Sequence, residues 1–246
     1  MYLKNINANM LNCSFDLVKV KKTLNIVKKL QPNLYLTRDN DSNLKRMLKM
    51  VKVGPEEELN ITIKGNTLSH EAYLNHIAND IDGVLKMVHY CNFNEYHFMV
   101  YALPIKWCPL HIFIKNHYHD KMYGSIVLKL FYGMYRTLVE LIYHGILYTS
   151  TTNNIIVNMD THEALLTNFS EAKQKPLTPE SLSMVIKQLK LYMYHLWTAD
   201  MDSKEVDLEW LKHVDASVPK VVMDILSLDE AEPYKLDGMV DMLLNV

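Results

Sequence analysis

The sequence is poor in the residues that mark several common classes of protein. It has three cysteines, Cys13, Cys91 and Cys108, which are widely spaced and odd in number. They supply neither a disulfide framework nor a C-x-x-C metal pair, so we expect an intracellular, reducing compartment, either cytoplasm or nucleus. The N-terminal residues lack the long apolar stretch of a signal peptide. No run approaches the roughly 18 consecutive apolar residues of a membrane span.

A strong net charge is also missing. The formal net charge is −2, which offers no global attraction to nucleic acid or to a membrane surface. A hydrophobic content of 49% and a charged content of 22% are ordinary for a globular protein, and 246 residues suffice for one large domain or two small lobes. Glycine is scarce, with seven residues. The richness in Asn, Lys, Tyr and Met hints at an AT-rich genome of viral or parasitic origin.

Residues 11–30 place apolar side chains such as Phe15, Val18 and Leu24 at helical intervals, with lysines between them. This pattern predicts an amphipathic helix within an N-terminal extension over residues 1–33. Such a helix either packs beside the domain with its lysines in water or docks onto an acidic or membrane partner.

After Pro32 and Asn33 the pattern changes to short strands separated by turns. Ser69 is a suitable cap for one helix in this region, which we expect at residues 69–79. The expected strands are 34–36, 44–53, 59–64, 84–88 and 96–103.

The remaining sequence is mostly helical in pattern. Its longest apolar repeat, in residues 125–143, lacks proline and predicts a long buried helix. A small hairpin is expected at 155–157 and 164–166. Further helices are expected at 180–197, 210–213, 219–226 and 236–244.

Four segments stand in the order and approximate spacing of protein-kinase motifs. They are LTRDNDSNL at 36–44, ITIK at 61–64, LYTSTTNN at 147–154 and LLTNFSEA at 165–172. On these segments the chain resembles the protein-kinase family, Ser/Thr branch, over about residues 34–244. The resemblance implies an α+β, reduced two-lobed fold, with an antiparallel sheet and one helix in an N-lobe at 34–103 and a mostly helical C-lobe at 104–246.

The resemblance assigns nucleotide-binding positions to Lys64, Glu71 and Val100. Lys64 matches the lysine of the V-A-I-K strand, and Glu71 on the following helix would be its ion-pair partner. Such a pair either survives as structure alone or still serves a nucleotide. Val100, on the last N-lobe strand, would guard the back of the nucleotide pocket.

The phosphate-binding loop of a kinase needs glycines, because its backbone N–H groups must approach the phosphates closely. The glycine template falls on Thr37, Asp39 and Ser42, so all three glycines are absent. Asp39 and Asp41 would also place negative charge beside the phosphates. The alternative interpretation is an ordinary polar hairpin loop.

The segment at 147–154 stands where a kinase has its catalytic loop. It sits one residue short of the kinase loop, or in a shifted register against it, and in no register does it offer a carboxylate or a cation, so Thr149 and Ser150 stand at degenerate catalytic positions. Asn154 matches the asparagine that holds Mg²⁺, although it also suits a turn before a strand. Asn168 replaces the D-F-G aspartate, and an amide binds Mg²⁺ far more weakly than a carboxylate does.

Two further matches are partial. Thr178-Pro179-Glu180 resembles the A-P-E motif, but nine residues after Asn168 leave no room for a peptide-binding activation loop. The aspartate expected in the helix after that motif is absent from residues 190–198. Lys235 stands near the position of a late C-lobe arginine.

A zinc site was considered at the histidine-rich stretch after residue 110. The spacing of His111, His117 and His119 suits one helix face poorly, and no cysteine pair accompanies them. We interpret these histidines as surface residues and expect no metal site.

We therefore expect a catalytically inactive kinase-like protein, a pseudokinase, without a cofactor. It would regulate or scaffold another protein, such as a kinase or a kinase substrate, and bind no nucleic acid. Three alternatives stay open. One is an unorthodox Ser/Thr kinase that uses Lys64, Glu71 and Asn154 with Asp160 as a displaced acid. Another is a nucleotide-binding module without turnover, which would retain residual ATP and Mg²⁺ binding. The last is a helical scaffold unrelated to kinases.

Overall fold

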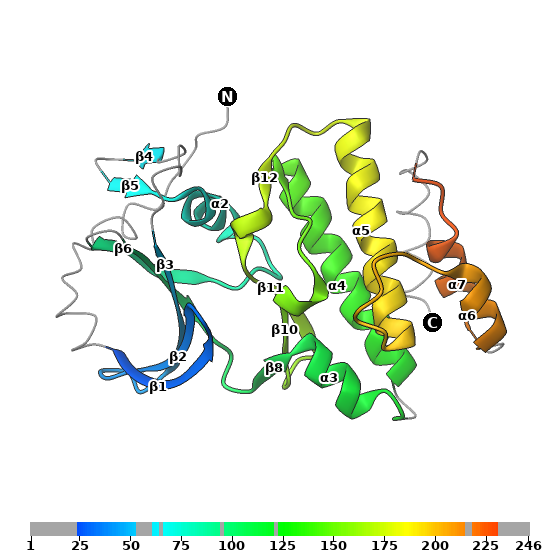
Figure 1. Cartoon of the computed structure of the whole chain (residues 1–246), viewed down its shortest axis with the longest axis horizontal. Helices are drawn as coiled ribbons and strands as arrows, with labels where there is room; N and C mark the ends of the chain where they lie inside the picture. The colour runs from blue at the N-terminus through cyan, green and yellow to red at the C-terminus, as the bar shows by residue number, and fades with distance from the viewer. Residues whose placement is uncertain are drawn as a thin grey trace. The chain divides into compact units, whose positions relative to one another are not determined.

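The structure, a computed structural model, describes residues 24–52, 61–63, 66–93, 96–120, 123–214 and 218–230. The chain divides into two compact units. The first unit comprises Met1–Asp80 and Leu85–Ile105, and the second comprises Ile81–Val84 and Lys106–Val246. Figure 1 colours the chain from its N-terminus in blue to its C-terminus in red. Together the elements make an α+β protein.

An antiparallel sheet of five strands forms the body of the first unit. The strand order is β1-β2-β3-β7-β6, and each neighbouring pair is antiparallel. The strands are β1 (Leu24–Gln31), β2 (Leu34–Asp39), β3 (Lys45–Lys52), β6 (Met87–Phe93) and β7 (Tyr96–Ala102). A separate hairpin pairs β4 (Ile61–Ile63) with β5 (Asn66–Leu68).

One face of this sheet carries an apolar cluster. Leu48 on β3 and Val100 on β7 lie opposite each other and are both buried. Leu24, Cys91 and Phe98 complete the buried part of the cluster. Period-two alternation along the strands brings these side chains to one face, and their removal from water stabilises the sheet.

The single helix of the first unit is α2 (His70–Ala78), close to the 69–79 predicted. Ser69 is its N-cap, and the Ser69 hydroxyl accepts a hydrogen bond from the backbone N–H of Ala72 at 3.2 Å. This bond satisfies one of the N–H groups that the first helical turn leaves without a partner.

The helix predicted for residues 11–30 is wrong for the part that the structure describes. Leu24–Gln31 is the edge strand β1, and residues 11–23 lie outside the described residues. Most side chains of β1 are exposed, on both faces of the strand. An edge strand without a buried face shows no apolar alternation, which is why its sequence resembled a solvated helix.

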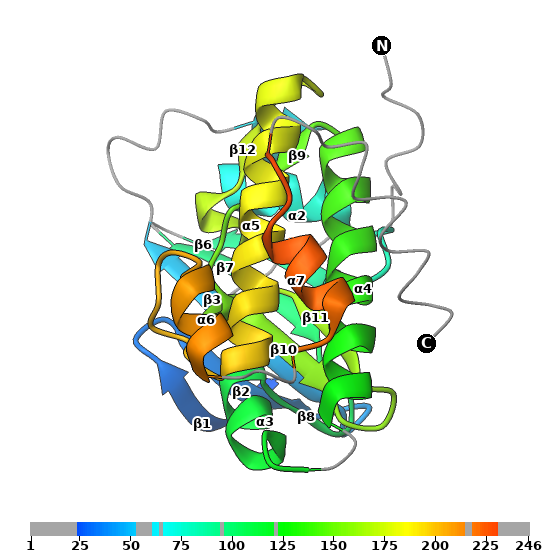
Figure 2. The same cartoon turned by 90° about the vertical axis from the view of Figure 1, so that its right-hand side faces the viewer.

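Helices dominate the second unit (Figure 2). The long helix α4 packs against α5, and α7 packs on α5 as well. Leu130, Met134, Leu138 and Leu141 are buried on α4, as the apolar repeat predicted. The helices are α3 (Leu110–His117), α4 (Tyr123–Tyr143), α5 (Pro179–Thr198), α6 (Leu208–Val214) and α7 (Lys220–Leu226).

Short strands hold the loops of the second unit in place. The predicted hairpin is present as β10 (Ile155–Asn158) and β11 (Glu163–Leu166), with β8 (Trp107–Pro109) on the other side of β10. A second pair joins β9 (Ile146–Leu147) to β12 (Lys173–Gln174). Two 3₁₀ turns are present, η2 (Thr152–Asn154) at the end of the 147–154 segment and η3 (Phe169–Glu171) directly after Asn168, which is its N-cap.

The predicted helix at 236–244 and Lys235 also fall outside the described residues. Within the part of the chain that is described, no helix is both long and apolar enough to cross a membrane.

The segment Ile81–Val84 leaves the end of α2 and joins the second unit. The Gly83 carbonyl accepts a hydrogen bond from the Leu166 N–H at 2.7 Å, and Val84 forms a parallel bridge with Leu166. Gly83 has a φ of +80°, and a Cβ atom there would lie 1.9 Å from Thr137 Oγ1. That hydroxyl donates to the Asp82 carbonyl at 3.0 Å. Glycine is therefore required at position 83.

Replacement of Gly83 by alanine is expected to lower the free energy of unfolding by roughly 2–3 kcal/mol, through backbone strain and displacement of Thr137. Gly133→Ala is the matched control. Gly133 lies within α4 with open space around it, so alanine there is expected to stabilise the helix by up to about 1 kcal/mol. Urea denaturation of both variants measures the difference. Equal stability of the two variants would contradict this account of the 81–84 segment.

Candidate functional site

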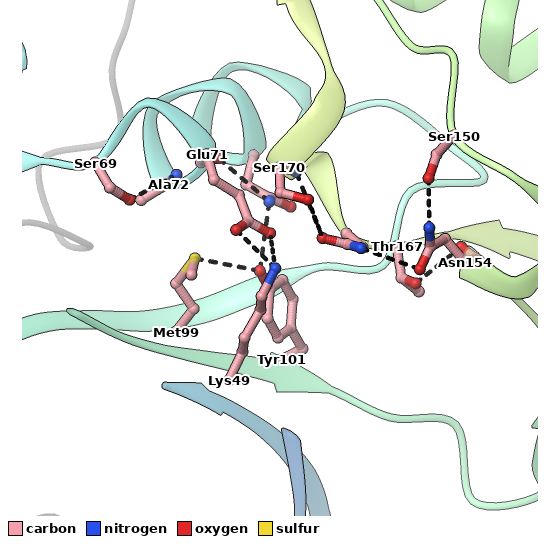
Figure 3. Close-up of polar contacts among 12 residues, drawn as sticks. Lys49, Ser69, Glu71, Ala72, Met99, Tyr101, Ser150, Asn154, Thr167 and Ser170 are labelled. Carbon is pink, nitrogen blue, oxygen red and sulfur yellow. Dashed lines mark hydrogen bonds and ion pairs between the residues drawn. The ribbon is translucent and has the colours of Figure 1, made fainter. Parts of the chain in front are cut away.

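An ion pair joins the sheet and the helix of the first unit. The Nζ of Lys49 on β3 donates to both carboxylate oxygens of Glu71 on α2, at 2.6 and 2.7 Å (Figure 3). The side chains are 17% and 8% exposed, so water screens their attraction only weakly. This pair fixes α2 to the third strand of the sheet.

Contacts at the start of α2 hold Glu71 in place. The backbone N–H of Ser69 donates to the hydroxyl of Tyr90 on β6 at 3.1 Å. Tyr90 in turn hydrogen-bonds His97 on β7, and burial raises the pKa of Tyr90 to about 12. The phenol is therefore neutral at physiological pH and anchors the helix cap to the sheet. Glu71 follows in the first turn, where the helix dipole favours a negative charge.

The predicted partner of Glu71 was Lys64, which lies outside the described residues, and in the structure Lys49 pairs with Glu71. The sequence prediction missed the strand β1, which shifts the count of strands by one. The third strand of the sheet is 45–52 rather than 59–64. On that strand the V-A-I-K pattern of the resemblance would fall on Arg46-Met47-Leu48-Lys49.

Val100 does not face the ion pair. Directly opposed residues of two strands share a face, and the register pairs Val100 with Leu48 and Met99 with Lys49. Val100 therefore lies in the apolar cluster on the opposite face from Lys49. The assignment of Val100 beside a nucleotide pocket is wrong by one residue of register.

The side chain that does accompany the ion pair is Tyr101. It is fully buried, its hydroxyl donates to the Met99 sulfur at 3.4 Å, and Asn75 on α2 donates to that hydroxyl at 3.4 Å. Burial and the negative charge of Glu71 hold its pKa well above the usual range. Met47, at the alanine position of the template, lies directly opposite Tyr101 and is also buried. Two large side chains thus occupy the sheet face beside Lys49.

The connection between β1 and β2 is too short for a phosphate loop. Pro32 and Asn33 alone join these strands, and the sequence has no glycine before Gly54. The predicted loop at 36–44 instead contains the end of β2 and the turn to β3. In that turn the Asp39 carboxylate accepts hydrogen bonds from the N–H groups of Asp41 and Ser42, both at 3.0 Å. The bond from Ser42 is the main cause that lowers the pKa of Asp39. The polar hairpin interpretation is confirmed.

In the second unit the structure brings Asn154 and Asn168 together (Figure 3). The Asn168 amide donates to Asn154 Oδ1 at 3.1 Å, and the Asn154 amide donates to the hydroxyl of Ser150. Asn168 Oδ1 accepts from the Ser170 hydroxyl at 2.8 Å. Both amide oxygens, the groups that would have to bind Mg²⁺, therefore already accept hydrogen bonds from the protein.

Two tyrosines position the backbone of this loop. The Tyr148 hydroxyl donates to the Thr167 carbonyl at 2.6 Å, and the Tyr192 hydroxyl on α5 donates to the Ser150 carbonyl at 2.5 Å. Tyr192 lies in the stretch where the sequence lacks the expected helix aspartate. A neutral phenol thus fixes the loop, and a single tyrosine in a helical pattern gave no signal of this role.

Carboxylates are absent from the loop that holds Thr149, Ser150 and Asn154. Ser150 is buried and Thr149 half-buried, and neutral hydroxyls are too weak as bases to deprotonate a substrate at physiological pH. Asp160, the displaced acid of the alternative mechanism, lies beyond the far end of β10 from Asn154 and forms an exposed ion pair with Lys106 at 2.8 Å. That carboxylate is therefore already engaged away from the loop.

No metal centre emerges from the described residues, where no group of three or more His, Cys, Asp or Glu side chains is arranged to hold an ion. His117, one of the three histidines considered for zinc, forms an ion-pair contact with Asp120 at 2.7 Å and stacks near Phe113. The amides at positions 154 and 168 are weaker ligands for Mg²⁺ than carboxylates are.

The match to the A-P-E motif has a local structural cause. Thr178 is the N-cap of α5, its side chain accepts from the Ser181 N–H at 3.1 Å, and Pro179 occupies the first helical turn. Threonine at the N-cap followed by proline is a common start signal for a helix. The motif therefore marks the beginning of α5 whatever the chain does.

No family model matches this chain. It is similar to uncharacterized protein 126R of Invertebrate iridescent virus 6, with 28% identity over 183 residues, which is 69% of this chain and 66% of the viral protein. The match thus spans just under two thirds of the relative's length.

Removal of one member of the ion pair is expected to leave a charge without its partner. Glu71→Leu should lower the free energy of unfolding by about 3 kcal/mol, whereas Lys49→Met combined with Glu71→Leu should recover most of that loss. Chemical denaturation of the two single variants and the double variant gives the coupling energy. Additive effects of the two substitutions would show that the two side chains do not stabilise the fold through their interaction.

The pH dependence of stability is expected to report on His195. Its Nδ1 lies 3.3 Å from the Thr152 hydroxyl, its Nε2 is 2.8 Å from the Ser203 carbonyl, and burial lowers its pKa. The unfolded chain, with a histidine pKa near 6.5, takes up the proton first, so stability should fall as pH drops below about 6.5. The slope due to His195 is at most about 1.4 kcal/mol per pH unit.

His195→Gln should reduce that slope, and His111→Gln, at an exposed position on α3, should leave it unchanged. Thermal melts between pH 5 and 8 provide the measurement. His76 and His89, whose pKa values burial also lowers, account for slope that remains in the His195 variant.

Proposed function

We propose that this chain is a pseudokinase, a protein-kinase-like protein without phosphoryl-transfer activity that acts by binding another protein. One observation carries the proposal. A lysine on the third strand of an antiparallel sheet pairs with a glutamate on the helix that follows, at 2.6 Å. Protein kinases have the same pair between strand and helix. We propose further that the first and second units are counterparts of the kinase N-lobe and C-lobe.

The second unit supports the proposal through position and spacing. Asn154 and Asn168 are hydrogen-bonded to each other, as the catalytic-loop asparagine and the D-F-G position of a kinase would require. The order of strands and helix along the first unit, three strands, a helix and two strands of the main sheet, is the order that the resemblance implied. Both agreements concern the architecture of the chain and not its catalytic groups.

The chemistry argues against catalysis. Phosphoryl transfer depends on a carboxylate base, cations beside the transferred group and a carboxylate that holds Mg²⁺. In this chain Thr149 stands at the base, Asn168 at the metal ligand and a two-residue turn at the phosphate loop. Each of these losses typically costs orders of magnitude in rate. The rival function of an unorthodox kinase would need Asp160, which Lys106 already neutralises.

Binding of nucleotide without turnover is the second rival, and the first unit offers an argument against it. Tyr101 and Met47 are large and buried on the sheet face that carries Lys49. The Lys49 ammonium is already neutralised by both Glu71 oxygens. We therefore propose that the ion pair is kept as a structural element and that a partner protein is the ligand. The viral relative supports a viral origin, and three widely spaced cysteines suit action in the cytoplasm or nucleus.

A thermal-shift titration tests this function. For a Kd weaker than 1 mM, ATP with Mg²⁺ at 1 mM stabilises the folded state by less than about 0.4 kcal/mol, a shift of about 1 °C. We expect a shift no larger than this, and no transfer of radiolabelled phosphate to the chain itself or to a generic protein substrate. Lys49→Met is the control. A larger shift that disappears in Lys49→Met would establish nucleotide binding and contradict the proposal that the ion pair is only structural.

A further inference from the structure

The outer edge of β1 is exposed along almost its whole length. β1 is the terminal strand of the sheet, and among the described residues only β2 pairs with it. Its register against β2 shifts between Ile26 and Lys28 and between Lys29 and Gln31, so an added strand would pair with β1 in short stretches. Ile26 and Val27 at its centre are 57% and 54% exposed. In Figure 1 this strand, in dark blue, forms the border of the sheet. A long edge strand with exposed apolar side chains is a template for the addition of another strand.

The surface around this edge is basic. Residues 24–52 contain seven lysines and arginines and two aspartates, in a chain whose formal net charge is −2. Four of the basic side chains are exposed and have no carboxylate partner in the described part of the chain. These are Lys28 and Lys29 on β1, Arg38 on β2 and Lys45 on β3.

Two of these cations lie against each other. The register places Arg38 directly opposite Lys45, and Arg38 donates to the neutral Asn43 side chain at 3.3 Å. Like charges in directly opposed positions of a sheet destabilise it. Binding of an anionic group beside Arg38 and Lys45 would reduce this repulsion.

Lysines on an edge strand normally prevent pairing with other strands. Here they discriminate between partners. A second copy of β1 would bring Lys28 and Lys29 close to the same residues of its partner, which is unfavourable in either orientation. A strand that carries carboxylates would meet complementary charge along the same edge. The edge therefore rejects its own copy and favours an acidic strand.

We propose that β1 binds an acidic, extended segment of a partner protein, which adds to the sheet as a sixth strand. Backbone hydrogen bonds to the free edge would hold the segment, its apolar side chains would cover Ile26 and Val27, and its carboxylates would face Lys28 and Lys29. Arg38 and Lys45 would extend the attraction across the neighbouring strands. This mode of recognition is β-augmentation.

A protein segment fits this edge better than a nucleic acid does. Single-stranded nucleic acids need aromatic side chains on which bases stack. Tyr35, the one aromatic residue of β1, β2 and β3, packs against the apolar cluster of the sheet. The exposed side chains that accompany the cations are Ile26 and Val27, which suit the alternating side chains of a strand.

This inference deepens the proposed function, because it names the class of partner, and its test is independent of nucleotide. A labelled twelve-residue peptide that repeats Val-Val-Glu-Glu, and so presents valine and glutamate on both faces of the strand, is titrated with the full chain and followed by fluorescence anisotropy. We expect saturable binding that weakens at least tenfold in Lys28→Glu/Lys29→Glu. The matched control Lys115→Glu/Lys187→Glu changes two exposed lysines of the second unit and should bind as the wild type does.

Two further peptides separate strand addition from simple charge attraction. A peptide of the same sequence with N-methylated alternate amides cannot form the backbone ladder, and a peptide that repeats Val-Val-Lys-Lys reverses the charge. Neither should bind. Any one of three results would overturn the proposal. They are equal binding of the methylated peptide, tighter binding of a single-stranded oligonucleotide, and displacement of the acidic peptide by self-association of the chain at high protein concentration. Loss of peptide binding would leave the nucleotide titration unaffected, so the two proposals fail separately.

Discussion

The ion pair between Lys49 and Glu71 is the constraint that the first unit depends on. Removal of an ammonium and a carboxylate from water is costly, and their mutual attraction offsets this cost only when the geometry is good. Both Glu71 oxygens lie within 2.7 Å of one Lys49 nitrogen, so the geometry is good. The pair also ties the single helix of this unit to its sheet. α2 is thereby held over the face that carries Tyr101, and the cap at Ser69 and the phenol of Tyr90 set its starting point.

In the second unit the loop around Asn154 is held by neutral groups. Around Asn154 the polar groups are amides and hydroxyls, and each donates to or accepts from a neighbour. Tyr148 and Tyr192 complete the arrangement through backbone carbonyls. A neutral network of this kind needs no ion or ligand to balance it, and it keeps its shape over a wide range of pH. Groups that bind charged ligands usually keep hydrogen-bonding capacity for the ligand, whereas these amides and hydroxyls already hydrogen-bond to one another.

Much of the fold could be predicted from the sequence, since long periodic segments carry a strong signal. The apolar repeat of α4, the cap of α2 and the hairpin of β10 and β11 all lie close to the predicted positions. The spacing between Asn154 and Asn168 is close to the kinase spacing, and in the structure the two side chains are hydrogen-bonded to each other. Edge strands carry no such signal, and the loss of β1 moved the expected lysine from position 49 to position 64.

The finer details of the candidate site depend on information that a single sequence does not contain. The face on which Val100 or Tyr101 lies is decided by the register of β3 against β7, and a shift of one residue exchanges the two faces. The role of Tyr192 depends on the packing of α5 beside a loop forty residues earlier in the chain. The helix α3 was missed because its eight residues, LHIFIKNH, are too few to show a clear helical period.

The segment Ile81–Val84 has a consequence for synthesis and for evolution. Residues on both sides of it belong to the first unit, yet it hydrogen-bonds to Leu166 and Thr137, which the ribosome delivers more than fifty residues later. A nascent chain that ends after Ile105 would leave the buried side chains of Ile81 and Val84 in water. Neither unit is a contiguous stretch of gene. A recombination event that replaced one unit would have to treat Ile81–Val84 separately, because these four residues belong to the second unit and lie between the two parts of the first. The two units are therefore expected to be inherited together.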